Sequence, residues 1–288
     1  MTELAVLNSM ADSDFETALD RHLAWRLRSL DLKDSIFGGG VLDLSDDHAA
    51  LVINMVESRG LNVYCVSTMI GHADIEVGER EFRARFRKPL QRAVELGGIL
   101  RPRFVRLLAA QTSRRSEIAD SGAYIRDKHP WLLDFYRDAI DQLSAAGFHV
   151  TIENEVGGCI WASEQEILQF LELLDRNDRV RLTWDIVNLW QMGSYPSVRG
   201  YELLRPHIGY VHLKGGRADP GSHRLAWASS LADASWPIEQ IGRRVIEDGA
   251  SPVLCLNPSH GARQPGYDYG HIVERDIEFV RGLFPEVQ

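Results

Sequence analysis

The chain has 288 residues and a mass of 32.5 kDa, with 44% hydrophobic and 25% charged residues, the proportions of an ordinary globular protein. Its 32 lysines and arginines against 41 aspartates and glutamates leave a net charge of −9, which disfavours nucleic acid as a partner. No apolar run approaches the roughly 20 residues that a bilayer-spanning helix needs, so no membrane partner is expected either.

The cysteine pattern points to a reducing compartment. Cys65, Cys159 and Cys255 are odd in number and far apart, and they form no Cys-x-x-Cys pair. Reduced thiols are therefore expected rather than a disulfide framework or a thiolate zinc site. The first twenty residues are acidic and mixed, unlike a signal peptide. We accordingly expect a cytoplasmic protein, and the sequence leaves a homo-oligomer open.

From about residue 27 the chain alternates short apolar runs, rich in β-branched residues, with longer segments of helical periodicity. Residues 1–24 are expected to be a helical segment that precedes the first strand. The expected strands are 27–32, 62–67, 104–108, 149–153, 181–185, 208–214, a weak 225–228, and 252–257. Helices are expected between these strands. Two of them begin at Ser45 and Ser163, and the helices 130–146 and 237–248 are each followed by a glycine. A last helix is expected at 272–283.

This alternation predicts an α/β fold with parallel strands and right-handed crossovers. No Gly-x-Gly-x-x-Gly follows the first expected strand, and no Gly-x₄-Gly-Lys-Ser/Thr occurs, so the usual nucleotide-binding open sheets lack their phosphate cradles. With about eight strands and no linker-like segment, the sequence predicts a single (β/α)₈ TIM barrel domain over residues 1–288.

Polar residues gather where the later strands are expected to end, which is where such barrels carry their active sites. These residues, on the fourth, fifth, sixth and eighth expected strands, are Glu153, Glu155, Asp185, Asn188, His212, Lys214, Asn257 and His260. Since successive strands point the same way, we expect these side chains to lie on one rim of the barrel.

A carboxylate, a second carboxylate, an imidazole and an amide form a mixed oxygen and nitrogen ligand set. We expect Glu153, Asp185, His212 and Asn257 to hold one divalent ion, Mn²⁺, Mg²⁺, Co²⁺ or Zn²⁺. Structural roles also fit: Asp185 as a helix cap, His212 as a core histidine, and Glu153 as an ion-pair partner of Lys214. Their coincidence at successive strand ends favours the site.

Residues 151–215 resemble the xylose isomerase-like barrel superfamily, which holds sugar-phosphate isomerases and epimerases, inosose dehydratases and endonuclease IV. That group shows Glu-Asn, Asp-x-x-His, His-x-Lys and a final Glu at successive strand ends; Glu153-Asn154, Asp185 and His212-x-Lys214 match. In those relatives the Glu, Asp, His and last Glu bind one metal, and the two Glu move protons on opposite faces of an enediolate. The resemblance thus implies a metal-dependent isomerase or epimerase with Glu153 as ligand and base.

Two positions depart from that pattern: Asn188 stands where the His is usual, and Asn257 where the last Glu is usual. An amide can offer its oxygen to a cation but cannot take up a proton near neutral pH. The second proton carrier is therefore expected to be Glu155 or His260, with Lys214 stabilising an oxyanion.

The expected partner is a small sugar, keto-sugar or polyol. Trp184 and Trp227 are candidates to stack on it, with Asn188 and Arg217 as polar contacts, although core packing and solvent exposure are the alternative roles of tryptophan and arginine at such positions.

Three other functions stay open on the same fold. A single base would suit a dehydratase or lyase, and loss of the final Glu would suit a non-catalytic relative. DNA repair of the endonuclease IV type needs more histidine ligands; Ser67, Thr68, Ala109 and Ala110 at the second and third expected strand ends disfavour it.

Overall fold

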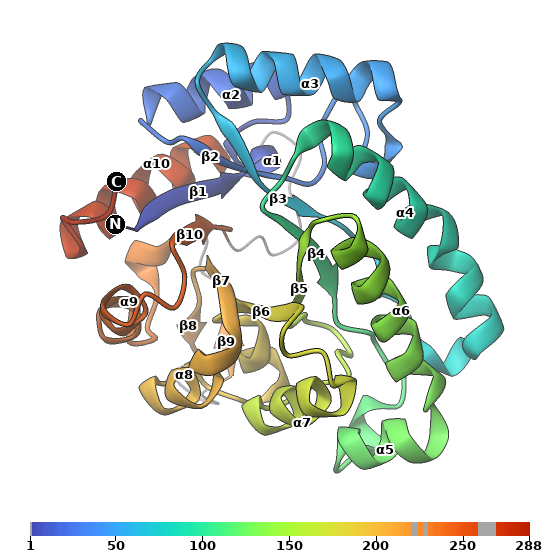
Figure 1. Cartoon of the computed structure of the whole chain (residues 1–288). Helices are drawn as coiled ribbons and strands as arrows, with labels where there is room; N and C mark the ends of the chain where they lie inside the picture. The colour runs from blue at the N-terminus through green and yellow to red at the C-terminus, as the bar shows by residue number, and fades with distance from the viewer. Residues whose placement is uncertain (1, 220–223, 227–229, 259–268) are drawn as a thin grey trace.

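Eight parallel strands close into a barrel in the computed structural model of the chain (Figure 1), which confirms the predicted α/β barrel. Around the barrel the strands follow the order β1-β10-β7-β6-β5-β4-β3-β2. They are β1 (Glu3–Leu7), β2 (Ser29–Leu32), β3 (Asn62–Ser67), β4 (Phe104–Leu108), β5 (His149–Glu153), β6 (Val180–Asp185), β7 (Ile208–Leu213) and β10 (Val253–Leu256). The structure describes residues 2–219, 224–226, 230–258 and 269–288.

Helices surround the barrel (Figure 1). They are α1 (Asn8–Ala11), α2 (Phe15–Ala24), α3 (Asp46–Ser58), α4 (Glu79–Leu100), α5 (Ser121–Lys128), α6 (Trp131–Ala145), α7 (Glu164–Leu174), α8 (Val198–Leu204), α9 (Ile238–Glu247) and α10 (Tyr269–Leu283). Within the described part of the chain, none of them combines the length and apolar character that crossing a membrane requires.

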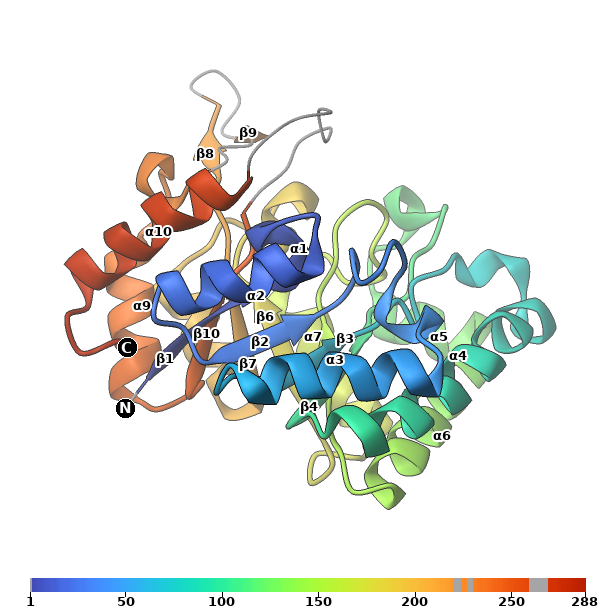
Figure 2. The ribbon, with the colours of Figure 1, turned by 90° about the horizontal axis from the view of Figure 1, so that it is seen from above.

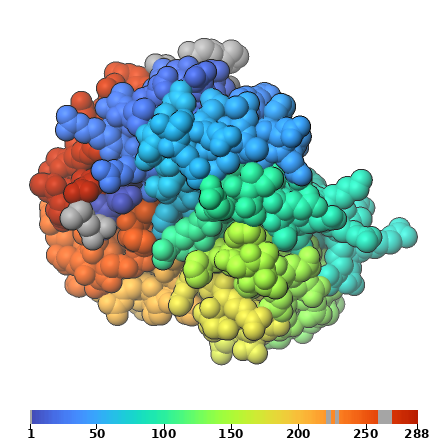
Figure 3. All heavy atoms as spheres, turned by 45° about the horizontal axis from the view of Figure 1, so that its top comes forward, coloured from blue at the N-terminus to red at the C-terminus, as the bar shows by residue number. Residues whose placement is uncertain are grey.

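The predicted helix boundaries have the expected chemistry. Ser45 and Ser163 accept backbone N–H bonds at the starts of α3 and α7, and Gly147 after α6 has the positive φ of a glycine C-cap. On α4, Phe82 and Phe86 are buried at helical spacing, while Arg85 between them is exposed and Arg83 pairs with Asp138 of α6. Figure 3 shows the first turns of α4, in cyan, standing out from the edge of the molecule.

The N-terminal segment differs from the prediction. Residues 3–7 of the expected helical segment 1–24 form β1, which pairs with both β10 and β2 and so closes the barrel. The weak strand expected at 225–228 is not in the barrel: β9 (Leu225–Ala226) pairs antiparallel with β8 (Arg217–Ala218) in a hairpin that stands away from it (Figure 2). Leucine and alanine suit helix as well as strand, and the pairing of Ala5 with Cys255 spans the chain, so local pattern could not reveal β1.

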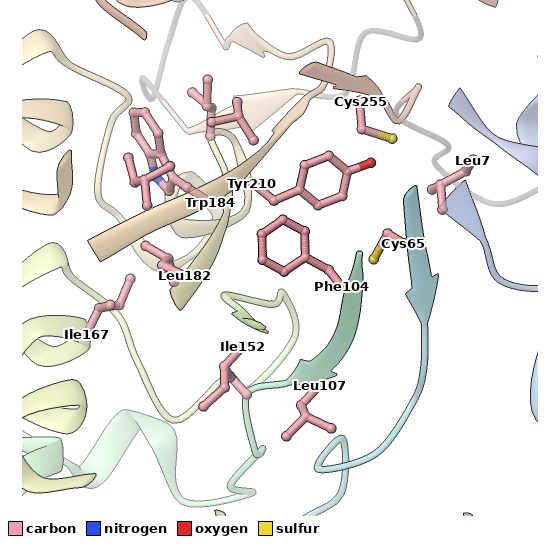
Figure 4. Packing of buried hydrophobic residues seen from close by; sticks show 14 of the residues in the cluster. Leu7, Cys65, Phe104, Leu107, Ile152, Ile167, Leu182, Trp184, Tyr210 and Cys255 are labelled. Carbon is pink, nitrogen blue, oxygen red and sulfur yellow. The ribbon is translucent and has the colours of Figure 1, made fainter. Parts of the chain in front are cut away.

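Strand alternation separates a packing face from a chemical face. Leu107, Ile152, Leu182 and Trp184 belong to the buried core, and Trp184 stacks on Tyr201 of α8 with ring centroids 5.9 Å apart. Tyr210 of β7 stacks on Phe104 of β4 at 6.3 Å, and Figure 4 shows both rings between the strands. Arg106 and His212 lie two residues beyond Phe104 and Tyr210 and so share their side of the strands. Glu153 and Asp185 alternate with Ile152 and Trp184 and end their strands.

Asp276 on α10 supplies a pH-dependent part of the stability. The carboxylate accepts hydrogen bonds from the Ser230 hydroxyl at 2.5 Å and the Leu231 N–H at 2.8 Å, and burial raises its pKa to about 7. A raised pKa means that the folded state binds the proton more tightly, so this contribution is present below pH 4 and is lost as pH rises through about 7.

We therefore expect the wild type to lose stability relative to Asp276→Asn steadily as the pH rises from 4 to 7. Urea unfolding of both proteins at a series of pH values measures it, and the asparagine oxygen can still accept both hydrogen bonds. A difference that stays constant over this range would show that Asp276 is ionised throughout.

Candidate functional site

Three ionisable side chains converge at the carboxyl ends of neighbouring strands. Glu153 ends β5, Asp185 ends β6 and His212 lies near the end of β7, and one ligand atom of each lies within 4.8 Å of the others. All three are buried, and the register of β6 with β7 places Asp185 directly opposite His212. The structure thus brings Glu153, Asp185 and His212 together, and the fourth predicted ligand, Asn257, contacts Asp185.

Glu153 is held by a buried cation that the sequence analysis did not identify. The Arg106 guanidinium pairs with Glu153 Oε2 and donates to the Thr68 carbonyl at 3.0 Å, and Arg106 is only 3% exposed. Burial by itself would raise the pKa of Glu153, but Arg106 and His212 lower it well below its usual range. A lone arginine in the apolar strand sequence FVRLL was the signal available.

Asp185 is both a cap and an ion-pair partner. Its Oδ1 accepts the Val187 and Asn188 backbone N–H bonds at 3.1 and 3.2 Å, so its predicted structural role is confirmed. Its Oδ2 contacts Lys214 Nζ at 2.7 Å and accepts from the Asn257 amide at 3.4 Å. Burial raises the pKa of Asp185, and Lys214 opposes that rise. Lys214 therefore pairs with Asp185, and not with Glu153 as the structural alternative proposed.

His212 lies between two carboxylates. Its Nδ1 is 3.0 Å from Glu153 Oε1, and its Nε2 is 3.5 Å from Oδ2 of Asp31 on β2. Burial lowers the pKa of His212, but the facing Glu153 and Asp31 raise it to about 9. Asp31 also accepts the Tyr210 hydroxyl bond at 3.2 Å. A carboxylate behind a histidine fixes which ring nitrogen faces the site, so Asp31 is a positioning residue.

Lys214 is oriented by two asparagines. Its ammonium donates to Asn188 Oδ1 at 2.8 Å, and the Asn188 amide donates to the Asn154 carbonyl at 2.8 Å. The Asn154 side chain in turn bonds the backbone of Asp185 through both its amide oxygen and nitrogen. Asn188, predicted as a substrate contact, thus lies in the site with its side chain engaged in holding Lys214.

The other predicted residues are distributed differently. Glu155 is half-buried beyond Glu153, and its Oε2 accepts the Val156 N–H at 2.9 Å. The prediction of Trp184 as a stacking residue is wrong, because its position on β6 faces α8; Arg217 is exposed on β8 and lies outside the cluster. Trp227 and His260 fall outside the described residues.

The donor chemistry suits a hard divalent ion. Glu153, Asp185 and His212 offer two carboxylate oxygens and an imidazole nitrogen within one small space, the ligand types that Mg²⁺, Mn²⁺ and Zn²⁺ take. The charge balance is less favourable, because Arg106 and Lys214 already neutralise the two carboxylates, and His212, whose pKa is raised, would have to lose a proton before its ring could bind an ion. An ion would share Asp185 Oδ2 with the Lys214 ammonium.

Comparison with solved structures shows the same fold. The probable 3-DHS dehydratase AsbF from Bacillus anthracis superposes with a TM-score of 0.71 at 12% identity, covering 97% of this chain and 98% of that one. A D-allulose 3-epimerase from Methylomonas sp. gives 0.71 at 12% identity, with 98% of each chain covered. A xylose isomerase-like TIM barrel protein from Mycobacterium smegmatis, in complex with magnesium, gives 0.70 at 15%, covering 98% and 96%.

Sequence comparison gives the family. A search of curated proteins found no match. The family model described as xylose isomerase-like TIM barrel matches residues 30–256, which span seven of the eight barrel strands and all the residues of the cluster. The resemblance drawn from the strand-end motifs is confirmed, and the chain belongs to the xylose isomerase-like TIM barrel family.

Proposed function

We propose that this protein is a divalent-metal-dependent isomerase or epimerase of a sugar, keto-sugar or polyol-like small molecule. The observation that carries the proposal is the convergence of Glu153, Asp185 and His212, with donor atoms within 4.8 Å of one another at the barrel's carboxyl end. Similar folds include an epimerase and a magnesium-bound protein, which supports the proposal without extending to this chain's substrate.

Glu153, Asp185 and His212 would hold the ion, with Asn257 beside Asp185. A bound divalent ion polarises a substrate carbonyl and stabilises the enediolate that forms when the neighbouring carbon loses a proton. Arg106 keeps Glu153 ionised and oriented, and Asp31 orients His212. Lys214, whose ammonium bonds Asn188, would donate a hydrogen bond to an oxyanion on the substrate.

The proton carrier is better assigned to Glu155 than to Glu153. A general base works best when its pKa lies near the operating pH, and Arg106 and His212 lower the pKa of Glu153. Glu155 is half-buried at the mouth, where it interacts electrostatically with Lys33, His72 and Lys214. Glu155, a half-buried carboxylate two residues beyond Glu153, is therefore our candidate for the proton carrier.

A dehydratase or lyase is the second candidate, favoured by Asn257. This residue occupies the strand end where the family's second proton-transferring Glu stands, and an amide cannot take up a proton. With one carboxylate base, the enediolate would expel a β-substituent instead of receiving a proton on its other face. One of the proteins with a similar fold is a probable dehydratase, and a dehydratase carries out an elimination of this kind.

The test is solvent-deuterium exchange over a panel of keto-sugars, cyclic polyol ketones and their acids, with Mg²⁺ or Mn²⁺ added. Isomerisation predicts deuterium incorporation without loss of mass, whereas elimination predicts loss of water, and mass spectrometry separates them. Glu155→Gln is expected to slow exchange by about 10²–10⁴-fold, the usual contribution of a general base.

The matched control is Glu117→Gln, an exposed carboxylate on the neighbouring loop, which should leave exchange unchanged. If Glu155→Gln has no effect and Glu153→Gln abolishes exchange while metal binding persists by calorimetry, the base is Glu153. No exchange and no elimination across the panel would reject the enzymatic proposal.

A further inference from the structure

A cavity of about 450 Å³ opens beside the carboxylate cluster, at the carboxyl ends of β2 and β3. Its walls are largely apolar, from side chains such as Val41, Ile70 and Phe86, and Lys33 and His72 also line it. Thr68 lines the cavity, and its carbonyl accepts a hydrogen bond from Arg106, the partner of Glu153, so the cavity lies next to the site. Lys33 also interacts electrostatically with both Glu153 and Glu155. Glu153, Asp185 and His212 do not line this cavity.

Lys33 is a half-buried lysine whose ammonium has no counter-ion in contact among the described residues. It forms no side-chain hydrogen bond and no ion pair with any residue that the structure describes. Burial lowers its pKa, and Arg106 lowers it further, while the carboxylates of Asp34, Glu153 and Glu155 oppose this. Because burying an uncompensated charge is costly, a lysine in this environment lacks the partner that would stabilise it.

The position of Lys33 is set by its backbone. The fully buried Asn8 accepts the Lys33 N–H at 2.9 Å and donates to the Asp34 carbonyl at 2.6 Å, and the Lys33 carbonyl accepts the Val41 N–H at 2.7 Å. These bonds fix the segment that follows β2. Its ammonium therefore extends into the cavity from a rigid base, an arrangement suited to a fixed ligand group.

His72 offers a second unused group on the same wall. Its Nδ1 is buried and has no hydrogen-bond partner among the described residues. The loop that carries it turns at Gly71, whose φ is +95° and where a Cβ would lie 2.3 Å from the Leu108 carbonyl, so only glycine allows this close approach. A ligand hydroxyl, which can donate or accept, would complement this ring nitrogen in either tautomer.

We propose that this cavity binds the anionic end of the substrate, with Lys33 as its counter-ion and His72 bonding an adjacent hydroxyl. The substrate class is then a hydroxylated compound that carries a carboxylate or a phosphate, not a neutral sugar. Two carboxylates, Asp34 and Asp43, also line the cavity; Asp43 accepts the Gly40 N–H at 2.9 Å at the exposed side. This inference names the substrate of the proposed function and rests on it.

Arg85 gives the cavity a second, outer cation. This side chain is exposed on α4, lies 5.7 Å from the Phe86 ring and lines the cavity at its rim. An exposed cation at the entrance raises the local concentration of anions and steers them inward in a salt-dependent way. Lys33 inside and Arg85 outside would thus act in sequence on an anionic ligand.

The test compares matched probes on the metal-loaded protein by calorimetry: fructose with fructose 6-phosphate, and galactose with galacturonate. We expect at least one anionic probe to bind about tenfold or more tightly than its neutral partner, as a charge-assisted hydrogen bond allows. Preference for the phosphate or for the carboxylate identifies which anion the site takes. Lys33→Met should abolish the preference, and Lys33→Arg should retain part of it.

Stability without ligand separates a binding role from a structural one. Since Lys33 has no described partner, Lys33→Met should melt at or above the wild-type temperature, whereas a structural lysine would lose stability on substitution. The exposed Lys128→Met is the charge-matched control and should keep the anion preference. Equal affinity for both members of each pair, or a preference that survives Lys33→Met, would overturn the inference.

The same probes in D₂O keep the two proposals distinguishable. Exchange on neutral sugars without any anion preference would leave the proposed function standing and remove this inference. Anion binding that depends on Lys33, with no exchange and no elimination on any probe, would support the cavity as an anion site and reject the enzymatic proposal.

Discussion

Replacing Arg106 with methionine is expected to destabilise the protein by about 3–5 kcal/mol, the range for breaking a buried ion pair by removing one partner. Arg106 and Glu153 are both nearly inaccessible, with side-chain exposures of 3% and 2%. The substitution leaves the Glu153 carboxylate facing His212 without its guanidinium, and it also leaves the Thr68 carbonyl without a donor. Urea unfolding at neutral pH, followed by fluorescence and circular dichroism, measures the loss.

Two variants show whether the loss comes from the uncompensated charge. Arg106→Met with Glu153→Gln removes both charges, so we expect this double variant to be more stable than Arg106→Met alone. The control Arg101→Met breaks an exposed pair with Glu57, whose side chains are 63% and 52% exposed, and should cost at most about 1 kcal/mol. A loss for Arg106→Met no larger than that of Arg101→Met would contradict a buried, charge-compensating role.

The barrel could be predicted because its later strands and helices carry strong local signals. Strands such as Phe104–Leu108 are short apolar runs, and helices such as α7 begin at a side-chain cap. The first strand could not be predicted, because Glu3–Leu7 looks equally helical and becomes a strand only by pairing with β10 at the other end of the chain. Its absence from the prediction shifted the expected strand numbering by one, and the two residues of β9 were counted in its place.

The site was predictable where a polar residue ends a strand, and less so inside strands. Glu153, Asp185 and His212 converge as expected, because parallel strands end on one rim. Arg106 and Asp31 lie within apolar strands, and only the three-dimensional register shows that they face Glu153 and His212. Trp184 was misassigned since alternation along β6 points it to α8 while its neighbour Asp185 points into the barrel.

In the proposed metal site, the Lys214 ammonium would compete with the ion for Asp185. The two side chains meet at 2.7 Å in a buried setting, and Asn188 holds the ammonium there. Two unit charges 4 Å apart interact by about 4 kcal/mol at an effective dielectric constant of 20, so a neutral residue at this position changes metal affinity strongly. Asn257, at the position where the resemblance implies a Glu, would lower the affinity of the proposed site in the same direction, because it carries no negative charge.

Lys214→Met is therefore expected to bind Mn²⁺ or Mg²⁺ at least about tenfold more tightly than the wild type, an effect of 1.4 kcal/mol or more. Calorimetric titration of the EDTA-treated proteins measures it directly, without any substrate. Lys128→Met, exposed on α5, removes the same formal charge far from the cluster and should leave the affinity unchanged. Lys214→Met with Asp185→Asn should lose the gain, because the carboxylate that the ion would share with Lys214 is gone.

In Lys214→Met, turnover should fall although metal affinity rises. If Lys214 donates a hydrogen bond to the substrate oxyanion, its loss is expected to lower turnover by about 10²–10³-fold, the usual effect of removing one such donor. Tighter metal binding would then show that Lys214 limits metal affinity, and lower turnover would show that it contacts the substrate. Unchanged affinity in Lys214→Met would instead show that the ammonium leaves Asp185 freely when the ion binds, and that its place beside Asp185 does not limit metal affinity.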